Sequence, residues 1–162
     1  MTFTALRRTF AAVAVIAGGA GLTATAFPAM ADEVTTYVTH GAAIGGTDPV
    51  AYFTDGKPVA GSDEFTATYD GVTWKFASAA NRDAFVAEPE KYAPAYGGYC
   101  ATGASFGVKI PIDPNKWHIV DGKLYLNANE GADKRFREDV EGTISRADEA
   151  WPKIKQIPAD KL

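Results

Sequence analysis

The sequence is poor in the side chains that most often hold metals or carry out catalysis. Of its 162 residues, one is cysteine, two are histidine and two are methionine. A single cysteine excludes an internal disulfide and the paired-cysteine spacings of zinc sites. The sequence also lacks a phosphate-binding loop, a serine nucleophile elbow, a zinc-protease helix motif and a dinucleotide fingerprint. We therefore expect a protein that is not an enzyme.

Acidic residues are missing from residues 1–31, which have the composition of a targeting segment. Arg7-Arg8 stands before an apolar, glycine-containing run, and small residues at positions 29 and 31 offer a cleavage site. An arginine pair followed by Phe10 favours the twin-arginine export route, and an ordinary secretory signal is the alternative. Either route predicts a periplasmic or secreted protein with no membrane anchor after cleavage.

Basic residues are the minority in the chain that would remain. Residues 32–162 contain 14 lysines and arginines and 20 acidic residues, which gives a net charge of −6. This balance argues against binding to nucleic acid or to anionic membranes. The remaining 131 residues are enough for one domain with a modest core.

Two β-hairpins are the clearest structural signals. Alternating apolar residues flank Asp70-Gly71 and, further along, Asp121-Gly122, and both dipeptides are typical of two-residue hairpin turns. After the first hairpin, Ser78 is placed to cap a helix over residues 79–87. Short strands are expected at residues 34–38 and 50–53.

Near the C-terminus, Phe136, Val140, Ile144, Ala147 and Trp151 recur at spacings of three and four, which predicts one amphipathic helix over residues 132–151. The fold class is therefore α+β, built from small antiparallel hairpins, a short helix and a long C-terminal helix. We expect one domain over residues 32–151, with its hairpin-helix core at residues 48–100 and a loosely held tail at residues 152–162.

Several stretches together resemble a known family. They are Asp48-Pro-Val-Ala-Tyr-Phe53, Trp74-x-Phe76-Ala-Ser78, Pro89-x-Lys91-Tyr92-Ala-Pro94 and Tyr96-Gly-Gly-Tyr-Cys-Ala101. In order and spacing they resemble a YHS domain of the longer, exported bacterial kind. The resemblance runs from about Gly45 to Trp151.

The resemblance implies a binding protein, because the wider YHS group is thought to bind metal through cysteines. Those cysteines typically follow Asp-Pro-Val and stand between Phe and Ser. Here the two positions hold Ala51 and Ala77, so neither ligand is carried over. Cys100 is the cysteine that lies within the resembling stretches.

The remaining metal-ligand candidates are Cys100, His40 and His118. A thiolate with one or two imidazoles suits copper first and zinc second. The three residues lack the close spacing of a sequence-local metal site. Cys100 follows Gly97-Gly98, where the backbone can approach closely and leave a thiol at the mouth of a pocket.

Two other kinds of function remain open. A small-molecule or protein-partner binding module would use an aromatic pocket, whose candidate residues are Asp48, Tyr52, Phe53, Trp74, Tyr96 and Tyr99. A thiol-dependent enzyme would use Cys100 as nucleophile with His118 or His40 as base. The identity of the ligand or metal, the oligomeric state and the partner are not fixed by the sequence.

Overall fold

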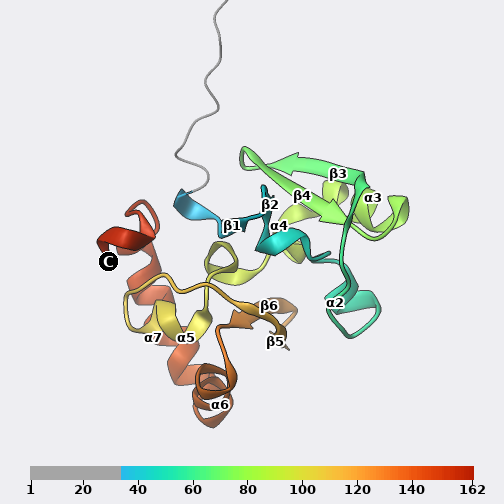
Figure 1. The fold of residues 1–162 in the computed structure, drawn as a ribbon. Coiled ribbons are helices and arrows are strands. Elements are labelled where there is room, and N and C mark those ends of the chain that lie inside the picture. The colour runs from blue at the N-terminus through green and yellow to red at the C-terminus, as the bar shows by residue number, and fades with distance from the viewer. Residues whose placement is uncertain (1–33) are drawn as a thin grey trace, which may run out of the picture.

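The computed structural model describes residues 34–162, so the expected targeting segment lies outside the described part of the chain. Within this part, helices surround three separate two-stranded antiparallel sheets, which confirms the α+β class (Figure 1). Among the described residues, no helix combines the length and the apolar character needed to cross a membrane.

The first hairpin forms where the sequence predicts it. Strand β3 (Ser62–Tyr69) pairs with β4 (Val72–Phe76), and Asp70 and Gly71 connect them with φ of 49° and 71°. Positive φ at both central residues is the geometry of a type I′ turn, whose twist matches that of the flanking strands. The pairing register shifts between Ser62 and Thr66, so the start of β3 is irregular.

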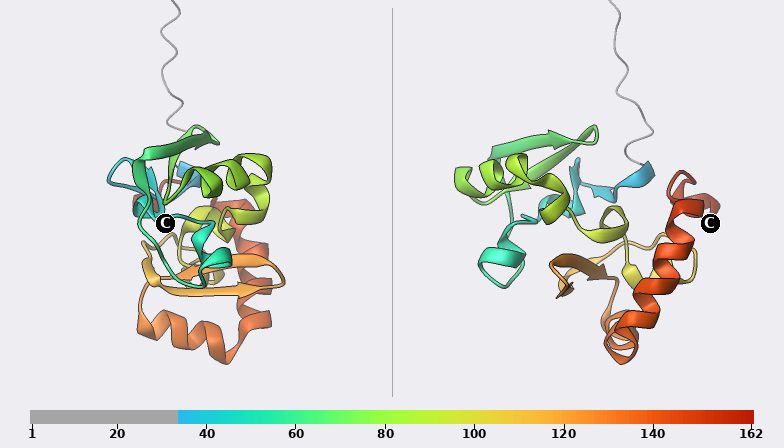
Figure 2. Two further views of the ribbon diagram at one scale, coloured as in Figure 1. Left: turned by 90° about the vertical axis from the view of Figure 1, so that its right-hand side faces the viewer. Right: turned by 180° about the vertical axis from the view of Figure 1, so that it is seen from behind.

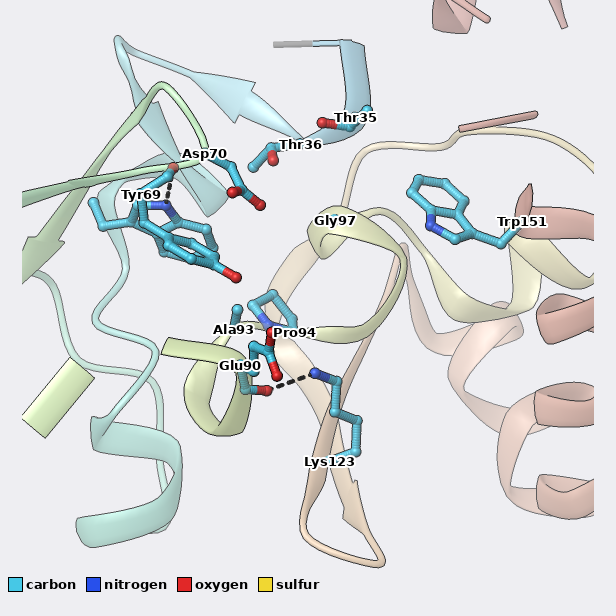
Figure 3. Close-up of a pocket in the computed structure, with 11 residues that line it drawn as sticks. Thr35, Thr36, Tyr69, Asp70, Glu90, Ala93, Pro94, Gly97, Lys123 and Trp151 are labelled. Atoms are coloured by element: carbon cyan, nitrogen blue, oxygen red, sulfur yellow. Dashed lines mark hydrogen bonds between the residues drawn. The ribbon is translucent and has the colours of Figure 1, made fainter. Parts of the chain in front are cut away.

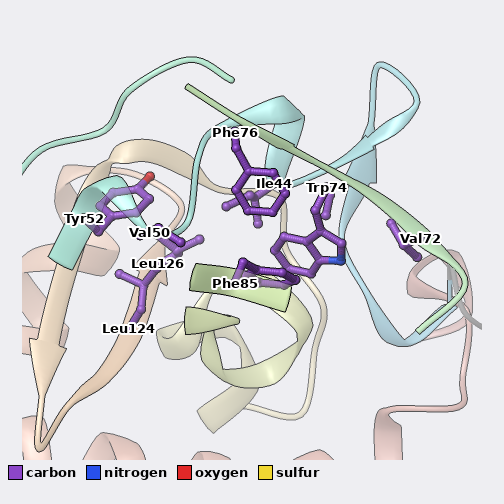
Figure 4. Packing of buried hydrophobic residues seen from close by; sticks show 10 residues of the cluster. Ile44, Val50, Tyr52, Val72, Trp74, Phe76, Phe85, Leu124 and Leu126 are labelled. Carbon is purple, nitrogen blue, oxygen red and sulfur yellow. The ribbon is translucent and has the colours of Figure 1, made fainter. Parts of the chain in front are cut away.

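Helix α3 (Ala79–Ala87) packs against this hairpin, and helix α4 (Pro89–Tyr92) follows it. Helix α3 begins at the predicted cap, where Oγ of Ser78 accepts a hydrogen bond from the Asn81 N–H at 3.1 Å. Its Phe85 is buried against Trp74 and Phe76, with ring centroids 5.1 Å apart in both pairs (Figure 4).

The segment before the hairpin differs from the prediction in two places. Strand β1 (Val38–Thr39) pairs with β2 (Ala42–Ala43), so the strand expected at residues 34–38 begins only at its last residue. Of residues 50–53, expected as a strand, the last three lie in helix α2 (Ala51–Thr54) and Val50 directly precedes it; the short 3-10 helix η1 (Ile44–Gly46) comes before. Asp48 causes the second difference, because its carboxylate caps this helical turn.

The C-terminal half starts with the 3-10 helix η2 (Ala95–Gly98) and helix α5 (Ala101–Ser105). The second predicted hairpin is confirmed as strands β5 (Asp113–Val120) and β6 (Lys123–Asn127). Its turn repeats the first one, with φ of 49° at Asp121 and 75° at Gly122. The two hairpins thus use the same local chemistry.

The C-terminal helix predicted as one element is two helices, α6 (Glu130–Glu138) and α7 (Val140–Ile154), followed by the 3-10 helix η3 (Ala159–Lys161). Asp139 breaks the run with φ of −149° and ψ of 68°, and its side chain accepts a hydrogen bond from the Gly142 N–H at 3.1 Å. A side chain at position 142 would collide with that carboxylate. Helix α7 also runs past Trp151 into the expected tail.

Strand β6 separates two hydrophobic clusters. Its Leu124 and Leu126 are buried in the first cluster, which contains residues of the first hairpin and α3 (Figure 4). Tyr125, between them, belongs to the second cluster, with residues of α6 and α7. Successive side chains of a strand point to opposite faces, so one short strand serves both clusters. The rear view in Figure 2 shows the β5–β6 hairpin between the first hairpin with α3, on one side, and α7, on the other.

The buried carboxylate of Asp48 ties together the elements around the first cluster. Oδ1 accepts hydrogen bonds from the N–H groups of Val50 at 2.8 Å and Ala51 at 3.3 Å. Oδ2 accepts from the Ala77 N–H at 2.8 Å and from Nδ2 of Asn81 at 2.7 Å. Asp48 itself is 0% exposed. One side chain therefore joins α2, the end of β4 and α3.

We predict that Asp48→Ala lowers the free energy of unfolding by about 3 kcal/mol or more, because it leaves buried N–H groups without an acceptor. Asp48→Asn retains one acceptor oxygen and should cost less, about 2 kcal/mol. Urea unfolding monitored by tryptophan fluorescence measures both. The control Asp55→Asn, at an exposed acceptor for Thr54, should stay within about 0.5 kcal/mol of wild type. Equal costs at positions 48 and 55 would contradict the role of Asp48.

Candidate functional site

A cleft of about 440 Å³ lies where the first hairpin meets the C-terminal half (Figure 3). The first hairpin, α4 and the loop after α4 supply part of its lining. The rest comes from the segment before β1 and from η2, β6 and α7. Six of them lie within residues 69–94 and five lie outside this range. The outer five are Thr35, Thr36, Gly97, Lys123 and Trp151. The cleft is therefore a product of the tertiary fold.

Aromatic side chains form much of its wall. Nε1 of Trp74 donates a hydrogen bond to the Tyr69 carbonyl oxygen at 3.3 Å, which fixes the two residues relative to each other. The Tyr69 ring also packs edge-on against Phe85, with centroids 5.7 Å apart. On the opposite side, Trp151 is held by Tyr96, at a centroid distance of 5.9 Å. These contacts preorganise the wall before any ligand arrives.

Two carboxylates and one ammonium group line the same cleft, on Asp70, Glu90 and Lys123. The Lys123 ammonium donates a hydrogen bond to the Glu90 carbonyl oxygen at 2.9 Å. Burial lowers the pKa of Lys123, and the charge of Glu90 offsets part of this effect. Burial also raises the pKa of Tyr69, and the charges of Asp70 and Glu90 raise it further. The Tyr69 hydroxyl consequently stays protonated at neutral pH.

An unusual backbone path forms the floor of the cleft. Tyr96 and Gly97 have φ of 55° and 60°, in the left-handed region that a tyrosine rarely adopts. The Gly97 carbonyl oxygen accepts a hydrogen bond from the Tyr37 N–H at 2.8 Å. A side chain at position 97 would collide with the Thr35 carbonyl oxygen, so glycine lets the N-terminal segment close the cleft.

Of the predicted pocket residues, the structure places Trp74 in this cleft. Asp48 instead forms the buried hydrogen bonds described above. Tyr52 is buried in the first cluster, and its hydroxyl donates to the Pro114 carbonyl oxygen at 2.9 Å. Burial raises the pKa of Tyr52, and the charge of Asp113 raises it further.

The other predicted tyrosines stand behind the cleft wall. The Tyr96 hydroxyl donates to Oδ1 of Asp148 at 2.9 Å, and burial together with this hydrogen bond raises its pKa. Tyr99 packs between Tyr37 and Trp151, with centroid distances of 5.5 and 6.3 Å. Phe53 packs edge-on against Tyr92, with centroids 5.3 Å apart. None of these three predicted rings lines the cleft.

Sequence reasoning missed four residues that give the cleft its character: Asp70, Glu90, Lys123 and Trp151. From the sequence, Asp70 reads as a turn residue and Lys123 as the first residue of a hairpin strand. Trp151 reads as part of the apolar stripe of the C-terminal helix. Glu90 carries no local signal. Their common location depends on how the two hairpins and α7 pack, which no local pattern reports.

Cys100 is fully buried at the start of α5, where its sulfur accepts a hydrogen bond from the Gly103 N–H at 3.3 Å. The sulfur also lies 3.7 Å from Oδ1 of Asn127. Burial raises the pKa of the thiol, and nearby backbone N–H groups offset this only in part. Cys100 contributes to the wall of a second cavity of about 290 Å³ together with Thr102 and Arg135.

The two histidines are engaged elsewhere or exposed. His40 is exposed in the turn between β1 and β2, with φ of 53°. His118 stacks on Phe136, with ring centroids 5.2 Å apart, and its Nε2 lies 2.7 Å from Oδ1 of Asp133. Within residues 34–162, no hydrogen bond joins either histidine to Cys100.

A metal centre held by several side chains of one chain does not fit this arrangement. Residues 34–162 contain no group of three or more His, Cys, Asp or Glu side chains that could hold a metal ion. Cys100, His40 and His118 are therefore not brought together as one ligand set. The groups hydrogen-bonded to the Cys100 sulfur are a backbone N–H and an amide oxygen, which are not the soft ligands that accompany a thiolate at copper or zinc.

The geometry thus defines a small α+β protein with a preformed, aromatic-walled cleft. A family model described as the YHS domain matches residues 50–96, and this match supports a YHS domain-containing protein. The matched segment contains α2, the first hairpin, α3 and α4, together with six of the residues that line the cleft. Comparisons with curated proteins and with solved structures find no match.

The buried carboxylate of Asp133 gives a pH-dependent prediction. Burial alone would raise the pKa of Asp133, but hydrogen bonds from His118 and Arg137 lower it below its ordinary value of 3.8. Ionised Asp133 therefore stabilises the fold above about pH 4, and this contribution is lost as the pH falls through the lowered pKa. Asp133→Asn should cost about 1 to 2 kcal/mol at pH 7 and progressively less in acid.

Unfolding curves for wild type and Asp133→Asn between pH 7 and about pH 2 test this linkage. Glu138→Gln serves as the control, because exposed Glu138 faces Lys134 at 3.8 Å and should cost less than about 0.5 kcal/mol. A difference between wild type and Asp133→Asn that stays constant over the whole pH range would refute the linkage.

Proposed function

We propose that this chain is an exported, non-catalytic binding protein of the YHS type, and that the cleft beside the first hairpin holds a small organic ligand. The observation that carries the proposal is the cleft itself, with its volume of about 440 Å³ and walls from Tyr69, Trp74 and Trp151. Ligand sites are typically concave, largely apolar and lined by a few polar groups. The composition of residues 1–31 supports export, by the twin-arginine or the general secretory route.

A non-catalytic role is supported by the state of the candidate nucleophile. Burial raises the pKa of Cys100, which disfavours the reactive thiolate. A cysteine nucleophile also needs a base within hydrogen-bond reach. In the described part of the chain, neither histidine forms such a bond with Cys100, and His118 is engaged with Asp133.

We predict that filling the cleft abolishes ligand retention. Ala93 lines the cleft, so Ala93→Leu adds bulk where the ligand would lie. Protein exported by its own leader should carry an organic molecule, detected by native mass spectrometry and by small-molecule analysis after denaturation. The amount of ligand bound to Ala93→Leu should be at least about tenfold lower than in wild type, because the larger side chain excludes the ligand. Ala80→Leu, an exposed position on α3, provides the matched control.

Two results would count against the organic ligand. One is protein that carries no organic molecule and gains no thermal stability from a library of small organic compounds. The other is Ala93→Leu that remains folded, as judged by circular dichroism, and retains the same ligand as wild type.

Copper or zinc bound at Cys100 is the second candidate function. The YHS match supports it, since metal binding has been suggested for this domain. The neighbouring cavity of about 290 Å³ brings Cys100 close to the surface. Because this chain offers no ligand group around the thiol within residues 34–162, the other ligands would come from solvent or from a second molecule.

We expect any metal in the exported protein to depend on Cys100. Mass spectrometry of metal content, on protein exported by its own leader and on Cys100→Ala prepared identically, measures this. Stoichiometric copper or zinc that disappears in Cys100→Ala, and persists in His40→Ala, would support a thiolate site. Metal absent from wild type, or equal in both proteins, would reject this second candidate.

A further inference from the structure

The charges that line the cleft are unbalanced. Asp70 and Glu90 provide two carboxylates, and Lys123 provides one ammonium group. Neither carboxylate forms an ion pair with another residue in the described part of the chain. Lys123 already donates a hydrogen bond to the Glu90 carbonyl oxygen at 2.9 Å. The side chains that line the cleft therefore carry one more negative than positive charge.

The orientation of the polar groups reinforces this imbalance. Figure 3 shows the Asp70 carboxylate and the Tyr69 hydroxyl pointing into the same open space, opposite Gly97. The carboxylate can only accept hydrogen bonds, and the hydroxyl oxygen can also accept one. A donor-rich, positively charged group satisfies both, whereas a carboxylate or phosphate would face Asp70 without a partner.

The aromatic residues fit the same ligand class. Tyr69, Trp74 and Trp151 line the cleft, and Figure 3 shows Tyr69 and Trp151 on opposite sides of the Asp70 carboxylate. An ammonium group that lies over an aromatic ring face gains electrostatic attraction from the ring, and the rest of the ligand gains apolar contact. Carboxylates together with aromatic rings therefore suit an organic cation with an apolar body.

We propose that the cleft selects organic cations, meaning molecules that carry an ammonium group on an apolar or aromatic body. This inference rests on the proposed function and names its ligand class. The ammonium group lies between Asp70, Glu90 and the Tyr69 hydroxyl. The apolar body lies along Pro94 and Trp151.

A bare metal ion is a poorer occupant of this cleft. Calcium takes six to eight oxygen ligands and magnesium requires near-octahedral geometry. Two carboxylates and one aromatic hydroxyl supply too few oxygen ligands for either ion. Within residues 34–162, no group of three or more His, Cys, Asp or Glu side chains could hold a metal ion. The volume of about 440 Å³ also falls in the range of organic ligand sites.

Three probes of nearly equal size separate charge from shape: 2-phenylethylamine, 2-phenylethanol and 3-phenylpropanoate. Titration into the mature protein, followed by amide chemical shifts in two-dimensional NMR, detects weak binding and reports where it occurs. The amine should shift the amides of residues 69, 70, 90 and 97, and should bind about tenfold more tightly than the alcohol. The anion should bind least, and added salt should weaken binding of the amine.

Asp70→Asn is the decisive variant, because asparagine is favoured at the first position of a type I′ turn and preserves the hairpin. Asp121→Asn is its matched control, at the equivalent position of the second turn with the same φ of 49° and outside the cleft. We expect Asp70→Asn to weaken binding of the amine about tenfold and Asp121→Asn to leave it unchanged. Glu90→Gln and the exposed control Glu64→Gln form a second pair.

The outcomes distinguish this inference from the proposed function. Equal affinity for amine and alcohol, or an unchanged affinity in Asp70→Asn, overturns the cation assignment and leaves an organic-ligand cleft. Tighter binding of the anion than of the amine also overturns the cation assignment and leaves an organic-ligand cleft. If none of the three probes shifts the amides of the cleft, both the cation assignment and the cleft as a site for ligands of this size are rejected.

Discussion

The buried carboxylate of Asp48 is the constraint on which the rest of the fold depends. A charge without solvent contact is costly unless hydrogen bonds replace the lost water, and four N–H groups do so here. Those groups belong to three different elements: α2, the end of β4 and α3. The bonds from Val50 and Ala51 are local, whereas the bonds from Ala77 and Asn81 form only when β4 and α3 pack beside Asp48. The first hydrophobic cluster and the hairpin that borders the cleft are thereby fixed together.

A second buried charge fixes the opposite side of the cleft. Nζ of Lys109 donates to the carbonyl oxygens of Val34, Lys155 and Ile157 at 2.7 to 2.8 Å. It also lies 5.4 Å from the centroid of the Trp151 ring. The lysine therefore holds the segment before β1 and the end of α7 at one point. Burial lowers the pKa of Lys109, and three carbonyl acceptors compensate the ammonium group for lost hydration.

Local chemistry explains which parts of the fold could be predicted. The two Asp-Gly turns and the cap at Ser78 depend on residues within a few positions, so the hairpins and α3 follow from the sequence. The turn at α2 was missed because an apolar run of four residues fits a strand as well as a helix. The break at Asp139 was missed although its signal, Asp139 capping the Gly142 N–H, is local.

The cleft could not be predicted, because no short stretch of sequence contains it. Trp74 was named as a pocket residue for its ring alone. Asp70 had a complete explanation as a turn residue, and Trp151 as part of an apolar stripe. Their second role appears only when distant elements meet. The tyrosines near Cys100 are neighbours along the sequence, and in the fold Tyr96 and Tyr99 pack against other aromatic rings next to the cleft.

The two sides of the cleft come from different parts of the chain. Residues matched by the YHS family model supply the acidic and aromatic side, with Tyr69, Asp70 and Glu90. The segment before β1, the start of β6 and α7 supply the other side, including Lys123 and Trp151. The matched segment alone would present its carboxylates on an open surface, where solvent screens their charge. Lys109 holds the segment before β1 and the end of α7, and these segments partly enclose the carboxylates, so charge interactions there are screened less than on an open surface.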